Sequence, residues 1–131
     1  PTEQYSYYYS PTGKLYTLAT RSASETYTYT FLYDALDRAT SVTQYGKTVT
    51  MAYDNIGNRT LFQTEAGRTT YTYDAANNLS RTEFAATGYP TLRADFAYNA
   101  NNMLENVTRY SDLAGSTKVA YSTYLYDALN R

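Results

Sequence analysis

Residues 71–79 read YTYDAANNL, and this nine-residue pattern decides the fold because related copies recur along the chain. The copies are residues 7–15 (YYYSPTGKL), 31–39 (FLYDALDRA), 51–59 (MAYDNIGNR), 96–104 (FAYNANNML) and 124–131 (YLYDALNR). The third position of every copy is a tyrosine, here termed the anchor tyrosine: Tyr9, Tyr33, Tyr53, Tyr73, Tyr98 and Tyr126. Consecutive anchors lie 20 to 28 residues apart. A short pattern that returns at this period is typical of a repeat architecture, with insertions in the other half of each unit.

The residues before each anchor alternate between large apolar and small or polar side chains. Tyr27, Tyr29, Phe31 and Tyr33 interleave with threonines and one leucine, and residues 48–53 follow the same pattern. A period of two predicts a β-strand with one packed face.

The residues after each anchor predict a tight turn. The next position holds Ser10, Asp34, Asp54, Asp74, Asn99 and Asp127, which can accept backbone N–H bonds from two or three residues further on. Three positions later stand Gly13, Asp37, Gly57, Asn77, Asn102 and Asn130, residue types that tolerate positive φ. The chain then returns along residues 15–18, 39–42, 59–62, 79–82 and 104–107. Each unit is therefore expected to be one β-hairpin.

A second turn in each unit is marked by a glycine, at Gly46, Gly67, Gly88 and Gly115. The prediction is an all-β fold of about ten or eleven short antiparallel strands in consecutive hairpins, forming a single array over residues 1–131. Short segments such as residues 34–38 are compatible with a helix, but they are too short to form more than one turn of it.

The composition fits this expectation and excludes several classes of protein. Eighteen tyrosines and four phenylalanines predict an aromatic, partly polar core in which each buried phenol needs a partner. The net charge is −1, and scattered lysines and arginines form no basic patch, which argues against a nucleic-acid partner. No apolar run approaches the roughly 20 residues of a membrane helix.

The residues do not predict an enzyme, a cofactor or a metal site. The chain has no histidine and no cysteine, so the usual general base, nucleophile pairings and transition-metal ligands are missing. Asp34, Asp54, Asp74 and Asp127 share one repeat position, which favours turn capping over a catalytic carboxylate pair. Asp37, at the left-handed turn position, is assigned to the turn in the same way. Five other acidic residues show no partner spacing and are expected on solvated faces: Asp95, Asp112, Glu65, Glu83 and Glu105.

The recurring pattern Tyr-x-Tyr-Asp-x-x-Gly-Arg/Asn-Leu/Arg resembles the YD repeat of RHS proteins. These include bacterial polymorphic toxins, the cage component of insecticidal toxin complexes, WapA-like wall proteins and teneurins. The resemblance runs from about Tyr5 to Arg131. It implies that hairpins join edge to edge into a sheet that spirals into a hollow shell, of which this chain is a part.

The chain departs from the family pattern in several places. Asn77 and Asn102 replace the turn glycine, and Asn99 replaces the turn aspartate. The Asp-Pro-x-Gly element and the autoproteolytic aspartates that follow the repeats in toxin members are absent, so the resemblance assigns autocleavage to no residue here.

Two functions are compatible with the resemblance. In the first, the chain is shell wall of a bacterial protein, secreted or at the cell surface, that encapsulates a C-terminal toxin and helps to deliver it. Its partners are then neighbouring repeats and the enclosed polypeptide. In the second, it is an extracellular adhesion or carbohydrate-binding array.

The tyrosines serve the two functions differently. Anchor tyrosines recur in register, which favours packing between neighbouring hairpins. Tyr16, Tyr45, Tyr89 and Tyr110 lie outside the pattern and are the better candidates for exposed contacts, including sugars. The terminal hairpins are expected to leave free strand edges and so to associate edge to edge, unless the tyrosines of residues 5–9 cover one edge.

Overall fold

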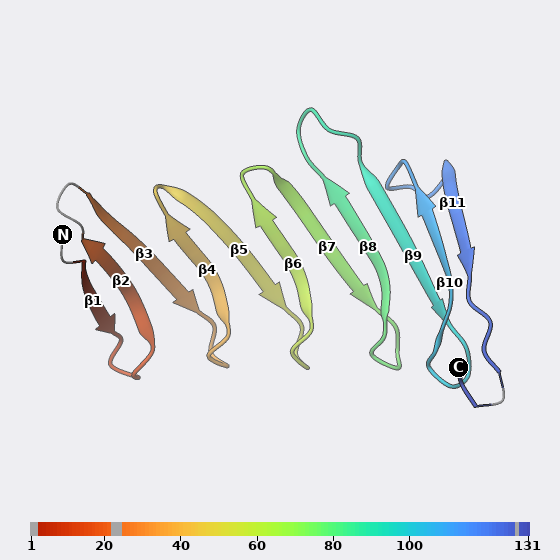
Figure 1. Ribbon diagram of the computed structural model, residues 1–131, viewed down its shortest axis with the longest axis horizontal. Coiled ribbons are helices and arrows are strands. Elements are labelled where there is room, and N and C mark those ends of the chain that lie inside the picture. The colour runs from red at the N-terminus through yellow and green to blue at the C-terminus, as the bar shows by residue number, and fades with distance from the viewer. Residues whose placement is uncertain (1–2, 22–24, 128) are drawn as a thin grey trace. The chain divides into compact units, whose positions relative to one another are not determined.

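The computed structural model describes residues 3–21, 25–127 and 129–131. All regular structure in these residues is β, with eleven strands and no helix, as the alternating patterns predict. The chain forms two compact units, Pro1–Glu65 and Ala66–Arg131, whose strands are labelled in Figure 1.

The first unit is an antiparallel meander in which each strand pairs with the next along the chain. Its strands are β1 (Gln4–Tyr9), β2 (Leu15–Arg21), β3 (Thr26–Tyr33), β4 (Ala39–Gln44), β5 (Lys47–Tyr53) and β6 (Arg59–Thr64). The repeat pattern closes the β1–β2, β3–β4 and β5–β6 hairpins.

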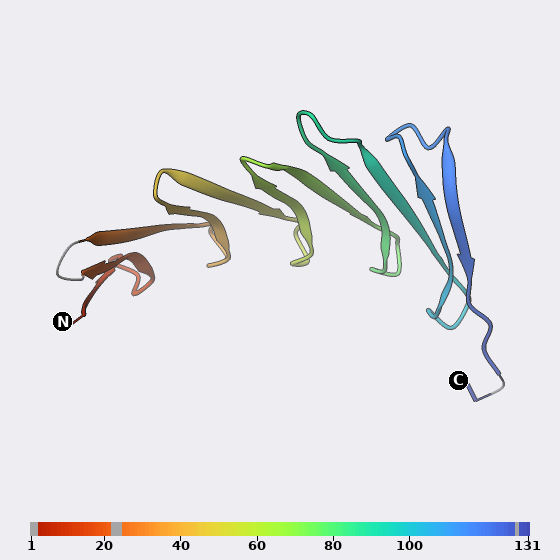
Figure 2. The same ribbon diagram turned by 45° about the horizontal axis from the view of Figure 1, so that its top comes forward.

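The second unit has the same plan. Its strands are β7 (Gly67–Tyr73), β8 (Leu79–Ala85), β9 (Leu92–Tyr98), β10 (Leu104–Tyr110) and β11 (Lys118–Thr123). Consecutive strands pair antiparallel, and the repeat pattern closes the β7–β8 and β9–β10 hairpins. Figure 2 shows these two hairpins from a second side.

The strand ends follow the repeat closely. The anchor tyrosine is the last residue of β1, β3, β5, β7 and β9, and each return strand begins at the predicted residue. The return strands run past their predicted ends; in β2, β4, β8 and β10 the residues beyond those ends pair with the following strand. Gly67 corrects one expectation: it is not a turn residue but the first residue of β7. A side chain there would place its Cβ 2.7 Å from the Cβ of Ala86, so close packing excludes one.

A β-bulge stands opposite every paired anchor. Leu32 pairs with Ser41 and Tyr33 with Ala39, so Thr40 has no partner. The corresponding skipped residues in the other hairpins are Tyr16, Thr60, Ser80 and Glu105. A bulge puts two residues opposite one and increases the local twist, so the twist is set next to each turn.

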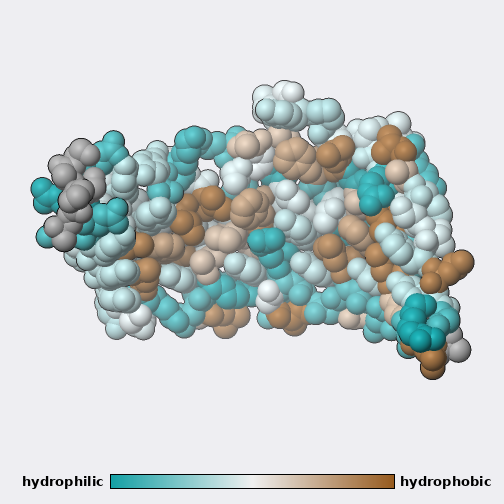
Figure 3. All heavy atoms as spheres, viewed as in Figure 1, coloured by the Kyte–Doolittle hydropathy of each residue, from teal (hydrophilic) through white to brown (hydrophobic). Residues whose placement is uncertain are grey.

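The expected aromatic core is replaced by an aromatic face. Val107, 3% exposed, is the one buried hydrophobic residue in the described part of the chain. The sheet of each unit carries no second layer of described residues, so its large side chains stay half-exposed or exposed. Figure 3 shows hydrophobic side chains gathered in separate patches with hydrophilic ones between them.

Candidate functional site

The turns of the repeat share one hydrogen-bond pattern. In the copy at Asp74, the Asp74 amide donates to the Asn78 carbonyl at 2.8 Å, and the Asn77 amide donates to the Asp74 carbonyl at 3.0 Å. The Asp74 carboxylate accepts the amides of Ala76 and Asn78 at 2.9 and 2.8 Å. The same bonds recur at Asp34, Asp54, Asn99 and Asp127. Ser10 keeps the backbone pair and accepts the Lys14 amide through its hydroxyl.

The bonds to the capping side chain come from two and four residues further on. The amide three residues on, Asn77 in the copy at Asp74, is already engaged by the backbone carbonyl of the capping residue. The positive φ predicted for the left-handed turn position is observed in all six copies: Gly13 (81°), Asp37 (64°), Gly57 (102°), Asn77 (69°), Asn102 (58°) and Asn130 (61°).

These turns hold their aspartates in the charged form. The amide of Arg38 is the main cause that lowers the pKa of Asp34, and the amides of Asn78 and Arg131 act in the same way on Asp74 and Asp127. At Asp54 partial burial alone would raise the pKa, but the side chain and amide of Asn58 outweigh it and the net shift is downward. These carboxylates are therefore engaged in hydrogen bonds within the turns.

Anchor tyrosines tie each hairpin to the one before it. The hydroxyl of Tyr33 donates to the Leu15 carbonyl at 2.9 Å, and that of Tyr53 donates to the Ala39 carbonyl at 3.1 Å. In the second unit Tyr98 bonds Leu79 at 3.0 Å and Tyr126 bonds Leu104 at 2.8 Å. Each accepting carbonyl belongs to the residue that pairs with the preceding anchor in the sheet. The remaining two anchors also stand at the ends of their strands. Tyr73 pairs with Leu79 and Tyr9 pairs with Leu15, and the Tyr9 side chain is 62% exposed.

A second tie runs from turn to turn through the eighth position of the repeat. The Lys14 ammonium lies 2.8 Å from the Asp37 carboxylate of the next turn. The Arg38 guanidinium binds Asp34 of its own turn and the Asp54 carbonyl of the next, both at 2.7 Å, and stacks over Tyr53 at 4.8 Å.

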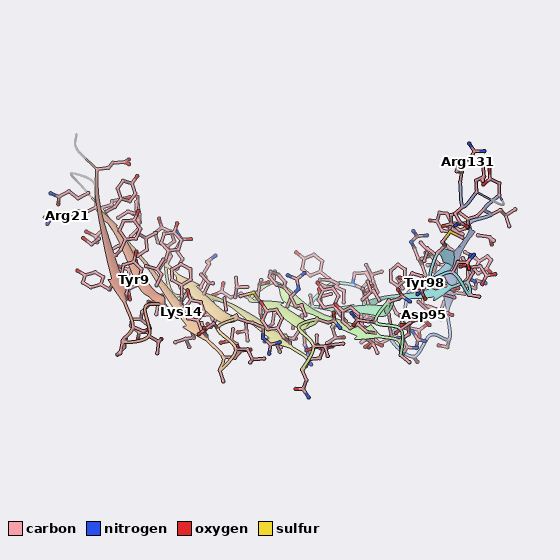
Figure 4. All side chains as sticks on the ribbon, turned by 90° about the horizontal axis from the view of Figure 1, so that it is seen from below. Tyr9, Lys14, Arg21, Asp95, Tyr98 and Arg131 are labelled. Carbon is pink, nitrogen blue, oxygen red and sulfur yellow. The ribbon has the colours of Figure 1, made fainter. Side chains whose placement is uncertain are left out.

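The eighth-position tie also occurs in the second unit. The Asn78 side-chain amide donates to Asn102 of the next turn at 3.2 Å and to Asp74 of its own turn at the same distance. Figure 4 labels Lys14 beside Tyr9 in the first hairpin and Tyr98 on β9. Anchor hydroxyls and eighth-position side chains thus add to the backbone pairing of β2 with β3, β4 with β5 and β8 with β9, which joins neighbouring hairpins.

The two faces of the first unit differ in chemistry. Directly paired residues share a face, so Tyr7, Leu18 and Tyr29 form one apolar row, and Phe31, Val42 and Val49 form another. The opposite face carries a threonine row of Thr17, Thr30, Thr43 and Thr48, in which the last two hydroxyls hydrogen-bond at 2.9 Å. Threonine pairs of this kind stabilise a sheet from its polar side.

The second unit carries an ion-pair cluster on one face. Arg93 and Arg81 both bind the Asp95 carboxylate, at 2.5 and 2.8 Å, and Glu83 lies 3.8 Å from Arg81. The Arg93 hydrogen bond is the first cause that lowers the pKa of Asp95. The expectation that Asp95 and Glu83 are solvated is therefore wrong. The register of β8 with β9 pairs Arg81 with Asp95 and Glu83 with Arg93, and Arg93 also stands two residues before Asp95 on β9.

Asp112 also departs from expectation. Its carboxylate accepts the amides of Ser116 and Thr117 and closes the β10–β11 connection. The Ser116 amide is the main cause that lowers the pKa of Asp112 to about 2. A serine and a threonine four and five residues after an aspartate were the available sequence signal.

Two open hollows lie on the sheets. One of about 330 Å³ in the second unit is lined mainly by Phe84, Leu92, Ala94 and Val119, with Arg109 at its side. The other, of about 390 Å³ in the first unit, lies between the first two turns beside Tyr16 and Phe31. Its carboxylates, Asp34 and Asp37, are engaged by their turn and by Lys14. Neither hollow presents a free acid–base pair.

Within the described residues, no three acidic, histidine or cysteine side chains come close enough together to hold a metal ion. The same residues contain no helix long and apolar enough to cross a membrane.

Comparison with known proteins assigns no family. No protein-family model matches the chain, and no curated protein shows significant similarity to it.

Proposed function

We propose that the chain is a non-catalytic wall segment of an RHS-type YD-repeat shell. The shell encloses the C-terminal toxin of a secreted or surface-located bacterial protein and helps to deliver it. Neighbouring repeats and the enclosed polypeptide are its partners.

The observation that carries the proposal is the tie from four anchor hydroxyls to the carbonyl of the preceding hairpin, as between Tyr53 and Ala39. A sheet held by ties between neighbours is extended by adding hairpins, without a core that must close. A sheet that can be extended in this way can form the wall of a shell.

The hydrogen bonds and ion pairs of the acidic side chains support a mechanical role. Asp34, Asp54 and Asp74 are bound by backbone amides, and Asp95 is bound by two arginines. Carboxylates engaged in this way stabilise turns and strand pairs, and they are poorly placed to exchange protons with a substrate.

The test uses the longer chain that carries this segment together with its toxin region. The toxin region is expected to resist a protease in the intact protein and to be cut faster when Tyr53→Phe and Tyr98→Phe loosen the ties. Tyr89→Phe, which changes a 68% exposed tyrosine outside the repeat, is the matched control. Digestion of the enclosed region as fast as the free toxin would refute the proposal.

The exposed tyrosines favour one alternative, an extracellular adhesion or carbohydrate-binding array. Tyr5, Tyr7 and Tyr89 are 55%, 54% and 68% exposed, and an aromatic face can stack on a sugar ring. A glycan array separates the two functions. Specific binding that is lost on changing these tyrosines to alanine would favour the alternative, and the absence of such binding would exclude it.

A further inference from the structure

Two tyrosine rings meet at the end of the β3–β4 hairpin. The ring centroids of Tyr27 and Tyr45 lie 5.0 Å apart with an angle of 68° between the ring planes, an edge-to-face contact. Tyr27 is on β3, and Tyr45 follows the last residue of β4. Because Tyr29 pairs with Gln44 at the end of the β3–β4 ladder, Tyr45 lies one residue and Tyr27 two residues beyond that pair.

The backbone at Tyr45 is unusual. Tyr45 and Gly46 have φ of 52° and 73° and connect Gln44 to Lys47, which is the two-residue hairpin turn with positive φ at both positions. That turn favours asparagine or glycine at its first position, and a bulky residue at positive φ is an outlier. The tyrosine is therefore not explained by the turn, whereas its ring contact with Tyr27 offers a reason for it.

The pair is accessible, and its surroundings are phenolic. Tyr45 is 63% exposed and Tyr27 is half-buried, so neither ring is fully enclosed by the protein. Tyr29 lies two residues after Tyr27 on the same face of β3, which brings a third phenol to the site. The chain contains no cysteine, so it cannot make a disulfide.

We propose that Tyr27 and Tyr45 are a site of oxidative cross-linking, at which a peroxidase-type one-electron oxidant with hydrogen peroxide joins the two rings as dityrosine. Each phenol O–H loses one electron and one proton, which gives two phenoxyl radicals. A carbon–carbon bond then forms between the ring carbons next to each hydroxyl-bearing carbon. Each of these carbons releases its hydrogen as a proton, and each phenol oxygen regains one. The protein loses two hydrogen atoms in total, and the peroxide oxygen–oxygen bond breaks to give two waters.

The link would close the open end of a hairpin that has no core beneath it. It joins β3 to the β4–β5 turn and so fixes three consecutive strands of the first unit at one point. A short closed loop holds its ends at an effective concentration on the order of millimolar, so at micromolar protein this link should exceed coupling between molecules roughly a thousandfold.

The experiment treats the purified chain with a heme peroxidase and hydrogen peroxide, then reads dityrosine fluorescence and the mass of tryptic peptides. Trypsin separates residues 22–38 from residues 39–47, and Tyr45 is the only tyrosine in the second peptide. The expected product is these two peptides joined with the loss of two hydrogens, fragmenting at Tyr27. Its yield should stay constant over a tenfold dilution, and the oxidised chain should melt at a higher temperature.

Tyr45→Phe and Tyr27→Phe each keep the ring but remove the phenol, so each should abolish this product. Tyr29→Phe and Tyr89→Phe should leave it, and circular dichroism of every variant checks that the sheet has formed. A link that fragments at Tyr29 or Tyr33, dimers whose yield falls on dilution, or tyrosine oxidation without the linked peptide would each overturn the proposal.

Discussion

The hydroxyl of Tyr98 donates a hydrogen bond to the carbonyl oxygen of Leu79 at 3.0 Å and so joins β9 to the beginning of β8. Leu79 itself pairs with Tyr73, the preceding anchor. Partial burial is the first cause that raises the pKa of Tyr98, followed by the negative charge of Asp74, so the phenol stays protonated and remains a donor. The bond therefore connects one repeat to the next by a group that does not titrate near neutral pH.

Changing Tyr98 to phenylalanine removes this bond and leaves the ring in place. The expected loss is about 1 kcal/mol of unfolding free energy, the usual net contribution of one hydrogen bond. Urea unfolding of the variant measures it. Tyr89→Phe, on an exposed connection, should change stability by less than about half a kcal/mol. Equal effects of the two changes would show that the hydroxyl does not tie the hairpins.

Gly57 provides a test of the turn position. Its φ is 102°, and no atom lies within 4 Å of where a Cβ would stand, so a side chain meets only backbone strain. Gly57→Ala should cost about 1–2 kcal/mol, the usual cost of a left-handed conformation for an L-residue. Gly57→Asn should cost less, because Asn77 and Asn102 occupy the same position with positive φ. Thermal unfolding of both variants measures the two losses of stability. Equal losses for Gly57→Ala and Gly57→Asn would contradict the role of positive φ at this position.

The six turns were predictable because their chemistry is local. An acceptor side chain and a residue tolerant of positive φ, such as Asp74 and Asn77, lie within four residues of each other and need no partner elsewhere. The strands were equally predictable, since a period of two can be recognised even where a single residue departs from it. The bulge at Thr40 was not predictable, because the alternation of side chains alone does not show which residue is left out of the pairing with the opposite strand.

The features that sequence reasoning missed depend on register or on a broken rule. Arg93 stands two residues before Asp95 on the same strand, but only the pairing of β8 with β9 brings the second arginine, Arg81, beside it. Tyr45 contradicts the residue preferences of its turn, so those preferences could not place it there. That Val107 is the one buried hydrophobic residue among the described residues could not be predicted either, because an aromatic face has the same alternation whether or not a second layer covers it.

Acid should unfold the chain over a window set by its turn carboxylates. The pKa of Asp112 is lowered to about 2 from an ordinary value of 3.8, and the pKa values of Asp34, Asp74 and Asp127 are also lowered. A depressed pKa in the folded state gives stability that is present above the unfolded value and is lost as pH falls through the folded value. Stability should therefore decline from about pH 4 to about pH 2.

Circular dichroism during an acid titration measures the decline. Asp112→Asn removes one titrating group and should make the decline shallower, whereas Glu65→Gln, an exposed carboxylate 3.8 Å from Lys47, should leave it unchanged. Stability that stays constant down to pH 2 in the unaltered chain would contradict the role of these carboxylates.

Asp95→Asn should be more damaging than the loss of a surface ion pair. The Asp95 side chain is 27% exposed and binds Arg81 and Arg93, so its neutralisation weakens two charged hydrogen bonds on one sheet face. Hydrogen bonds to charged groups contribute about 1.5–3 kcal/mol, so a loss of about 2 kcal/mol is expected. The Lys47–Glu65 pair is a suitable comparison, because pairs so exposed contribute roughly 0–1 kcal/mol. If Glu65→Gln lowers the urea midpoint more than Asp95→Asn does, the role assigned to Asp95 is refuted.

The outer edge of β11 is the place where two copies of the chain should meet. β11 pairs with β10 on one side, and no described strand covers its other side. An uncovered strand exposes unpaired amide and carbonyl groups that another strand can bind. Val119 and Tyr121, 59% and 53% exposed, add apolar surface to this edge. Light scattering over a concentration series should therefore show association, and Val119→Lys should reverse it by placing a charge on the edge.

Tyr126→Lys is the less suitable variant for this test, because it would also break the hydrogen bond from Tyr126 to Leu104. The tyrosines of residues 5–9 lie on β1, which pairs with β2 and is itself an edge strand of the first unit with every residue exposed. A chain that stays monomeric at hundreds of micromolar, with the amides of β11 protected from hydrogen exchange, would exclude edge pairing. If Val119→Lys leaves the oligomer intact, the association lies elsewhere, and the apolar row of Tyr7, Leu18 and Tyr29 is then the surface to change next.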